Sequence, residues 1–183
     1  MPTHQDEKAY YYILHVITGK EEQVCTKIQN CLCNQSFTPF TFKKNVSFKR
    51  GKEISEVTRI IFPGYVFIKS CIAEAAFLII IMDFVRKTND IFKLLNYGSY
   101  EKIAVNETEI NFLLDLCNDN YCIEYSKGLI EGDRVKVIEG PLKGQESRIL
   151  KINKQKKNAV ITVFLVNEVR TITIGLDYIT KAN

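Results

Sequence analysis

The sequence predicts an α+β protein in two parts, a mixed N-terminal part and a C-terminal part built of short strands. Residues 1–117 alternate strand-like stretches with amphipathic helical ones, and residues 118–128 lose this periodicity. Short alternating strands with turn signals follow over residues 129–183, a pattern typical of a small five-stranded barrel with few open edges. We therefore predict an N-terminal domain, a linker and a C-terminal domain with these boundaries.

The N-terminal part begins with a strand, a helix and a second strand that Pro-Gly interrupts. The aromatic and β-branched run YYYILHV predicts a strand over residues 10–16. Thr18 with Glu21 three positions later is a capping-box pattern, and apolar residues then recur at helical spacing. A charged hairpin is predicted around residues 50–52. The next strand, RIIFPGYVFIKS (residues 59–70), is predicted to kink in its middle.

Two further helices complete this part. The stretch AEAAFLIIIMDFVRK is apolar on most faces, so we expect a well-buried helix there. Asn106 and Glu109 form a second capping-box pattern at the start of a third helix. The longest apolar run, residues 75–82, is far shorter than the ~20 residues of a membrane span. Because no basic start with a following apolar stretch opens the chain, we expect a cytoplasmic protein that contacts no membrane.

The sequence motifs point away from catalysis. The sequence has no phosphate-binding loop, no dinucleotide fingerprint and no nucleophile elbow, and its carboxylates show no paired spacing. The six cysteines lack paired C-x2-C spacing, so reduced thiols that fill small apolar sites are expected in preference to zinc ligands. His15, alone on a strand, is expected to be structural. These patterns predict a binding protein, not an enzyme, with no cofactor and no metal.

Positive charge is concentrated at the C-terminal end. Residues 129–183 hold 10 Lys and Arg against 6 Asp and Glu, which accounts for the whole net charge of +4. This asymmetry indicates a polyanion-binding end, and a solvated basic face without a partner is the alternative.

The C-terminal segment EGDRVKVIEGPLKGQESRILKI, residues 131–152, resembles a KOW motif. Val135 and Val137 would point inward from the first strand, and Gly144 stands where the chain bends back. Ser147 replaces the glycine that the motif usually has next. KOW motifs occur in several RNA-associated proteins.

Two N-terminal segments, YYILHVITGKEEQVCTKI and FPGYVFI, resemble the N-terminal domain of the NusG family, and the order of the parts is also that of the family. The resemblance spans about residues 10–181. It implies an antiparallel four-stranded sheet flanked by helices, then a linker, then a five-stranded SH3-like barrel. It also implies binding to RNA polymerase during elongation.

In the family, the sheet surface around F-P-G-Y-V forms a depression that receives the clamp region of the largest polymerase subunit. The resemblance therefore implies a polymerase-binding surface with Tyr11, Phe62, Pro63, Gly64 and Tyr65, where Tyr11 replaces the usual Trp. A kinked strand can present Phe62 and Tyr65 at the surface. The alternative is that both rings belong to the core.

Strand alternation in NAVITVFL predicts which residues face the barrel interior. Ala159, Ile161, Val163 and Leu165 are expected to face inward, and Thr162 and Phe164 outward. An outward Phe164 could stack on a base, fill a pocket of a partner or cover a barrel end.

The C-terminal part also resembles a specialised branch of the family, the LoaP antiterminators, in which a basic KOW domain recognises an RNA hairpin in the nascent leader. Val166 and Asn167 stand where general NusG proteins have an aromatic-Gly pair that contacts Rho or a ribosomal protein. The residues expected to bind RNA are Lys143, Arg148, Lys151, Lys154, Lys156, Lys157, Phe164 and Arg170.

The expected function is that of a specialised, monomeric NusG paralog that binds elongating RNA polymerase and promotes antitermination through an RNA hairpin. The alternatives are a general NusG factor whose KOW domain binds proteins and, more remotely, a ribosome-associated RNA-binding protein. The β-branched residues of the barrel strands favour a stable barrel over refolding to helices.

Overall fold

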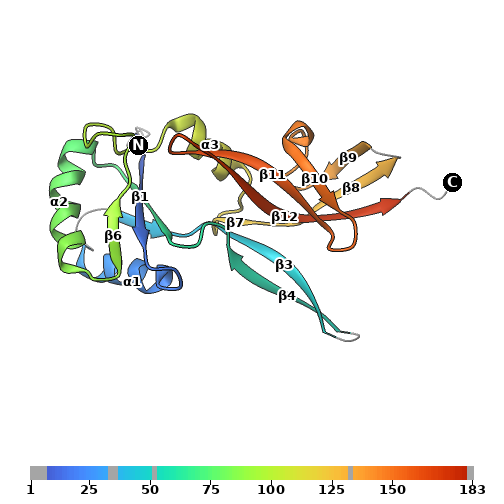
Figure 1. Cartoon of the computed structure of the whole chain (residues 1–183), viewed down its shortest axis with the longest axis horizontal. Helices are drawn as coiled ribbons and strands as arrows, with labels where there is room; N and C mark the ends of the chain where they lie inside the picture. The colour runs from blue at the N-terminus through green and yellow to red at the C-terminus, as the bar shows by residue number, and fades with distance from the viewer. Residues whose placement is uncertain (1–7, 33–36, 51–52, 132–133, 181–183) are drawn as a thin grey trace, which may run out of the picture. The chain divides into compact units, whose positions relative to one another are not determined.

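The computed structural model describes residues 8–32, 37–50, 53–131 and 134–180 (Figure 1). The chain divides into two compact units. Unit 1 comprises Met1–Thr41 and Phe62–Glu107, and unit 2 comprises Phe42–Ile61 and Thr108–Asn183. This division differs from the predicted boundaries, because residues 42–61 and 108–128 group with the C-terminal strands.

Unit 1 contains a four-stranded sheet in the order β2-β5-β1-β6, and all three of its strand pairs are antiparallel. This sheet and the mixed α+β class confirm the predicted fold. The elements are β1 (Tyr10–Val16), α1 (Glu21–Cys31), β2 (Phe37–Phe40), β5 (Tyr65–Ser70), α2 (Glu74–Lys87) and β6 (Ile91–Leu94).

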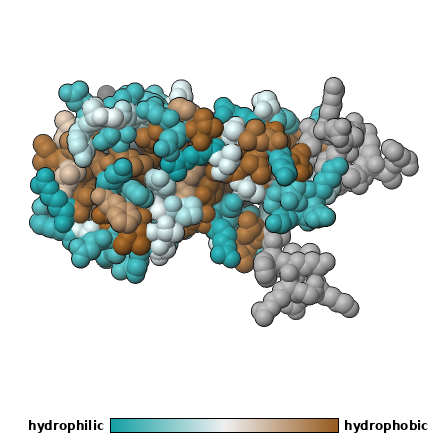
Figure 2. Space-filling view, viewed as in Figure 1, coloured by the Kyte–Doolittle hydropathy of each residue, from teal (hydrophilic) through white to brown (hydrophobic). Residues whose placement is uncertain are grey.

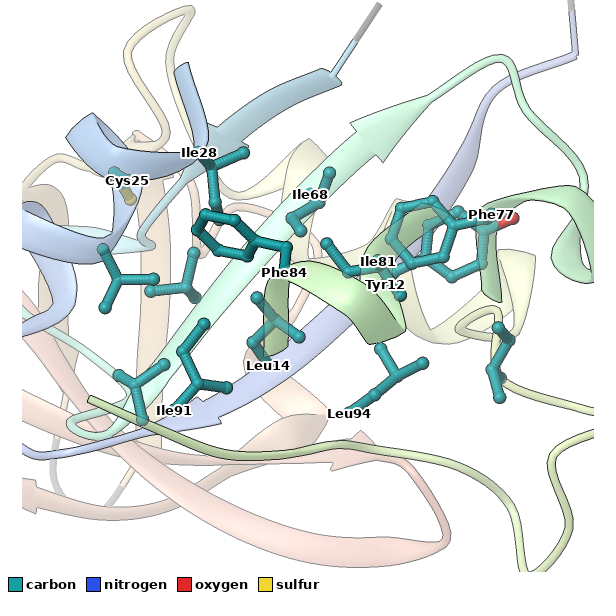
Figure 3. Close-up of a cluster of buried hydrophobic side chains, with 14 residues drawn as sticks. Tyr12, Leu14, Cys25, Ile28, Ile68, Phe77, Ile81, Phe84, Ile91 and Leu94 are labelled. Atoms are coloured by element: carbon teal, nitrogen blue, oxygen red, sulfur yellow. The ribbon is translucent and has the colours of Figure 1, made fainter. Parts of the chain in front are cut away.

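The core of unit 1 lies between the sheet and its two helices (Figure 3). Alternate residues of β1, namely Tyr12, Leu14 and Val16, pack against residues of α1 and α2 because side chains of a strand alternate between its two faces. The ring of Tyr12 stacks on that of Phe77, and its hydroxyl donates to the carbonyl of Ile72 over 2.7 Å. This burial raises the pKa of Tyr12.

The helix α2 is less buried than its composition predicts. Phe77, Ile81 and Phe84 point into the core, but Ile79 is 78% exposed. Hydrophobic residues reach the surface of unit 1 in the region of α2 and β6 (Figure 2). The expectation that the whole helix is well buried is therefore wrong, because only one face of the helix meets the sheet.

The Pro-Gly interruption separates two strands of different sheets. The strand β4 (Glu53–Ile60) ends before it and β5 begins after it at Tyr65. The prediction of one kinked strand over residues 59–70 is thus wrong, since the chain leaves one sheet and enters another there.

Unit 2 contains a three-stranded sheet in the order β4-β3-β7 and a five-stranded sheet in the order β10-β11-β12-β8-β9. The five-stranded C-terminal sheet confirms the predicted strand number, and its β12–β8 pair is parallel. The charged hairpin pairs β3 with β4, and of its predicted turn around residues 50–52, residues 51 and 52 lie outside the described residues. The remaining elements are β3 (Lys43–Arg50), α3 (Glu107–Asp115), β7 (Cys122–Ile123), β8 (Ser126–Glu131), β9 (Arg134–Glu139), the 3-10 helix η2 (Glu146–Arg148), β10 (Ile149–Asn153), β11 (Asn158–Leu165) and β12 (Glu168–Thr180).

The predicted alternation along β11 is confirmed, because Ala159, Ile161, Val163 and Leu165 are each at most 1% exposed. Gly140 follows β9 with a φ of 95°, and a Cβ there would lie 2.7 Å from the Cα of Ser126. Within the described ranges, no helix has the length and apolar character needed to cross a membrane.

Candidate functional site

The turn before β5 is held by a buried carboxylate. The two oxygens of Glu21 accept hydrogen bonds from the amide of Gly19 (2.8 Å) and from that of Gly64 (2.6 Å). The predicted capping box at Thr18 is wrong, because the N-cap of α1 is Lys20 and makes no side-chain cap hydrogen bond. Glu21 instead ties the start of the helix to a turn 43 positions away.

Gly64 leaves little room for a side chain. Its φ is 83°, a region that residues with a Cβ rarely adopt. A Cβ at this position would lie 3.2 Å from the Oγ1 of Thr18 and 3.3 Å from the carbonyl oxygen of Val16. Since the amide of Val16 also donates to the carbonyl of Gly64 (2.8 Å), the turn is fixed against the end of β1. This turn places Tyr65 at the start of β5.

Three rings gather at this end of the sheet, and we call His15, Tyr65 and Phe92 the aromatic trio. His15 pairs with Tyr65 across β1 and β5, and their rings stack with centroids 5.4 Å apart. The rings of His15 and Phe92 lie 5.0 Å apart, and Phe92 is 60% exposed. His15 and Tyr65 are half-buried, so the trio forms a supported aromatic surface.

A register shift in β6 accounts for the exposed ring. His15 pairs with Lys93 and Val16 pairs with Ile91, so Phe92 is the extra residue of a bulge. Bulges redirect side chains, and here Phe92 and Lys93 are both exposed although they are consecutive.

The five residues expected to bind polymerase differ in their exposure to solvent. Tyr65 is half-buried and Pro63 is exposed, whereas Gly64 is buried. Phe62 is 4% exposed and its ring lies 5.9 Å from that of Phe67. The expectation that Phe62 is presented at the surface is therefore wrong, because its ring packs on β5.

The fifth residue, Tyr11, is half-buried and meets the ring of Phe40 edge-on at 6.4 Å. Phe92 was not predicted as a site residue from the sequence, and His15 was expected to be structural. The only signal for Phe92 was an aromatic residue in a short strand, IFKL, and periodicity alone does not reveal the bulge.

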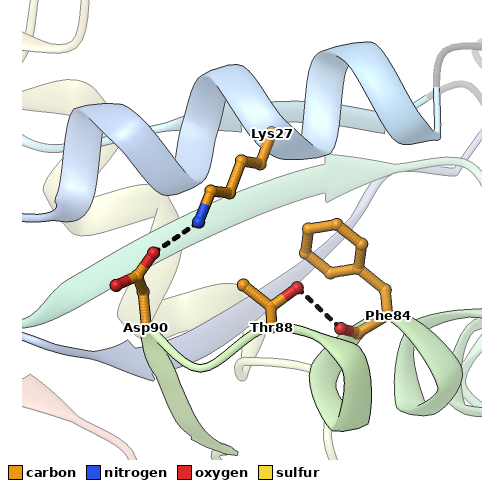
Figure 4. Close-up of polar contacts among 4 residues, drawn as sticks. All are labelled: Lys27, Phe84, Thr88 and Asp90. Carbon is orange, nitrogen blue, oxygen red and sulfur yellow. Dashed lines mark hydrogen bonds and ion pairs between the residues drawn. The ribbon is translucent and has the colours of Figure 1, made fainter.

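Charged side chains lie on the segments that carry the trio. Lys20 and Lys93 are exposed. Two carboxylates of these segments are already engaged, because Glu21 accepts from the amide of Gly64 and Asp90 is bound by Lys27 over 2.5 Å (Figure 4). The hydrogen bond from Lys27 lowers the pKa of Asp90, with a further contribution from Lys20, so this carboxylate is already neutralised by α1. In the same loop the hydroxyl of Thr88 donates to a carbonyl of α2.

The cations expected to bind RNA fall into two groups. Four lysines are exposed and have no ion-pair partner in the part of the chain that the structure describes, namely Lys143, Lys151, Lys154 and Lys156. They lie in the loop before η2, on β10 and in the turn between β10 and β11.

The other three cations are engaged within unit 2. The guanidinium of Arg148 lies 4.0 Å from the centroid of the Phe112 ring. Lys157 forms an ion pair with Asp177 at 2.9 Å, which raises the pKa of Lys157 and lowers that of its partner. Arg170 forms an ion pair with Glu168 at 2.6 Å. Fewer cations are therefore available to a partner than the seven that the sequence predicted.

The β11–β12 turn has an unusual backbone. Val166 and Asn167 have φ angles of 50° and 60°, as in the two-residue turns that favour Asn-Gly. The buried carboxylate of Glu109 on α3 accepts from the amide of Val166 over 2.8 Å. Helix and turn are thus joined within unit 2.

The five cysteines that the structure describes are free thiols. Cys25 and Cys122 are buried, as fillers would be, whereas Cys31 and Cys71 are exposed. Burial raises the pKa of Cys117 to about 12, which disfavours the reactive thiolate. No group of His, Cys, Asp and Glu among the described residues is arranged to hold a metal ion.

Known proteins resemble this chain in both parts. The family model described as "Transcription termination factor nusG" matches residues 9–114, more than half of the chain, and the model "KOW motif" matches residues 131–164. Proteins named "Transcription termination/antitermination protein NusG" from Streptococcus pyogenes serotypes M3 and M1 are each 24% identical over 123 residues, or 66% of this chain.

The match spans 65% of the length of these relatives. The solved structure "Domain interaction in Thermotoga maritima NusG" covers 92% of this chain, and the match covers 94% of that protein. Its TM-score is 0.50 at 19% identity, so this likeness concerns the fold alone.

Proposed function

The chain belongs to the NusG family, and on that premise we propose that it binds elongating RNA polymerase through the aromatic trio of unit 1. The partner would be the clamp region of the largest polymerase subunit. We further propose that unit 2 binds an RNA hairpin in the nascent leader and that the protein thereby promotes antitermination, as a LoaP-type paralog. It would act as a cytoplasmic monomer.

The observation that carries the polymerase proposal is the exposed ring of Phe92, which lies 5.0 Å from the ring of His15, which is itself stacked on Tyr65. A few well-packed residues supply most of the binding energy at protein interfaces, and aromatic side chains are frequent among them. The Glu21–Gly64 hydrogen bond holds the turn that precedes Tyr65, so little order has to be gained on binding. Phe62 then acts as a support beneath the surface, since its ring is buried.

The RNA proposal is supported by the four unpaired lysines of unit 2. An unpaired lysine needs no internal ion pair to break before it meets a phosphate, so its full charge is available for backbone contacts. Lysine contacts of this kind give affinity without sequence selectivity, which the shape of a hairpin would supply.

A transcription assay tests the combined function. Purified polymerase transcribes a template with a leader hairpin followed by a terminator, and the added protein is expected to increase read-through. Tyr65→Ala should abolish this effect while the protein stays folded, because it removes the ring that stacks on His15. The matched control is Ile79→Ala, which removes an exposed apolar side chain from α2 outside the trio. Equal read-through with Tyr65→Ala would contradict the proposal.

A further inference from the structure

The outward face of β10, β11 and β12 has a composition that the charge count does not reveal. These strands lie side by side in one sheet (Figure 1). Because residues paired across strands share a face, the register identifies the side chains on the face opposite the buried one. They are Phe164 opposite Val169, Thr162 opposite Thr171, Val160 opposite Thr173, and Lys151 opposite Val160.

The face is graded from apolar to cationic along the strands. Phe164 is 44% and Val169 is 70% exposed, and both lie next to the β11–β12 turn. The hydroxyls of Thr162 and Thr171 follow, and neither has a hydrogen-bond partner in the described part of the chain. Lys151 pairs with Val160, so it lies roughly 13 Å along the strands from Phe164 at a rise of about 3.3 Å per residue.

None of these seven paired positions carries a carboxylate. Glu168 belongs to the opposite face, because it pairs with the buried Leu165, and Arg170 shares that opposite face through its pairing with Val163. Lys154 and Lys156 extend the positive end in the turn after β10. The face therefore combines a ring, free hydroxyl donors and unpaired lysines.

We propose that this outward face binds unpaired loop nucleotides of an RNA stem-loop, with Phe164 stacked on a base and the lysines on phosphates. The inference rests on the proposed RNA binding of unit 2 and specifies its ligand. In duplex RNA the bases stack on one another and offer no free face, whereas splayed loop bases stack on aromatic side chains. Threonine hydroxyls donate to phosphate or to the ribose hydroxyl.

A protein partner fits the face less well. A stable interface buries about 800 Å² on each partner, and among the described residues the exposed large apolar side chains at the tip are Phe164 and Val169. The rest of the face would bury free hydroxyls and lysines, which cost free energy unless each finds a partner. A polyanion satisfies both kinds of group.

The test uses the full chain and two fluorescein-labelled RNAs that share one stem, a stem-loop with an eight-nucleotide loop and a blunt duplex. Wild-type protein should bind the stem-loop more tightly. Phe164→Leu keeps an apolar side chain but removes the ring, and should weaken stem-loop binding roughly 5- to 150-fold while leaving duplex binding unchanged. Ile138→Ala is the matched control, since Ile138 is an exposed apolar residue of β9.

The lysines are tested by the salt dependence of stem-loop binding. Lys151→Gln should lower the slope of log affinity against log salt by about 1. Lys127→Gln removes the same charge from a lysine already paired with Glu139 at 3.0 Å, and should change the slope less.

Two results would overturn the inference while leaving the proposed RNA function intact. These are equal binding of the stem-loop and the duplex, and full stem-loop affinity in Phe164→Leu. The second result would also be expected if the tip contacts a protein. If wild-type protein binds neither RNA, the inference and the proposed RNA function both fail, whereas polymerase binding is unaffected by that result.

Discussion

Replacing Gly64 by Ala should disturb both stability and the aromatic trio. A residue with a Cβ at a left-handed φ costs roughly 1–2 kcal/mol, partly offset by about 0.4–1 kcal/mol from restricting the unfolded chain. At Gly64 the new Cβ would also press on Thr18 and on the carbonyl of Val16 at 3.2 and 3.3 Å. Crowding of this kind adds about 1–3 kcal/mol. We expect a total loss of about 2–4 kcal/mol for Gly64→Ala.

Gly98→Ala is the matched control for this variant. Gly98 has a φ of 99°, and an added Cβ would meet nothing within 4 Å. It should therefore show the backbone cost alone, about 1 kcal/mol. Urea unfolding of the two variants gives both free energies, and the difference between them isolates the contacts around Gly64. Equal losses would refute the reasoning, because they would mean that the turn can move away from β1 at no cost.

Three further predictions concern buried or paired carboxylates. Glu21→Gln should lower the free energy of unfolding by about 1–3 kcal/mol in urea titration, because an amide offers one acceptor oxygen for two amides; an unchanged midpoint would contradict the role of Glu21. Asp90→Asn should be less stable than wild type at pH 7, and the difference should vanish in acid, because Lys27 lowers the pKa of Asp90 from its ordinary 3.8. The stabilisation is present above pH 3.8 and is lost as the pH falls through the lowered pKa, so a difference that persists at pH 2 would contradict it. Glu109→Ala should speed hydrogen exchange at the amide of Val166, and unchanged exchange would show that this amide is protected by other means.

Local patterns in the sequence correctly predicted features that repeat over a few residues, such as the alternation of buried and exposed side chains along a strand. The alternation along β11 was correct because a period of two leaves only one way to bury Ile161 and Val163. The capping prediction for Thr18 was wrong because Glu21 finds its partner in a turn far along the chain, and no local pattern encodes that contact. For the same reason the sequence identified the Pro-Gly interruption but could not show that it separates two sheets.

The residues of the candidate site were harder to predict than the strands, because their contacts depend on tertiary structure. Tyr65 was predicted, but Phe92 reaches His15 only because of a bulge in β6, and the pairing of β6 with β1 cannot be read from either strand alone. Counting charges likewise overestimated the free cations of unit 2. Lys157 is neutralised by Asp177, which lies close to it only in the folded sheet, and Arg170 by Glu168, two positions earlier on the same strand.

The central claim is that the aromatic trio is the polymerase-binding surface. Its most direct test is the dissociation constant of the full chain for purified RNA polymerase, measured for wild type and for Phe92→Ala. Phe92 is largely exposed, so its removal should leave stability nearly unchanged and weaken binding about tenfold or more. Wild-type affinity in Phe92→Ala, or no binding by the wild-type protein, would contradict the account.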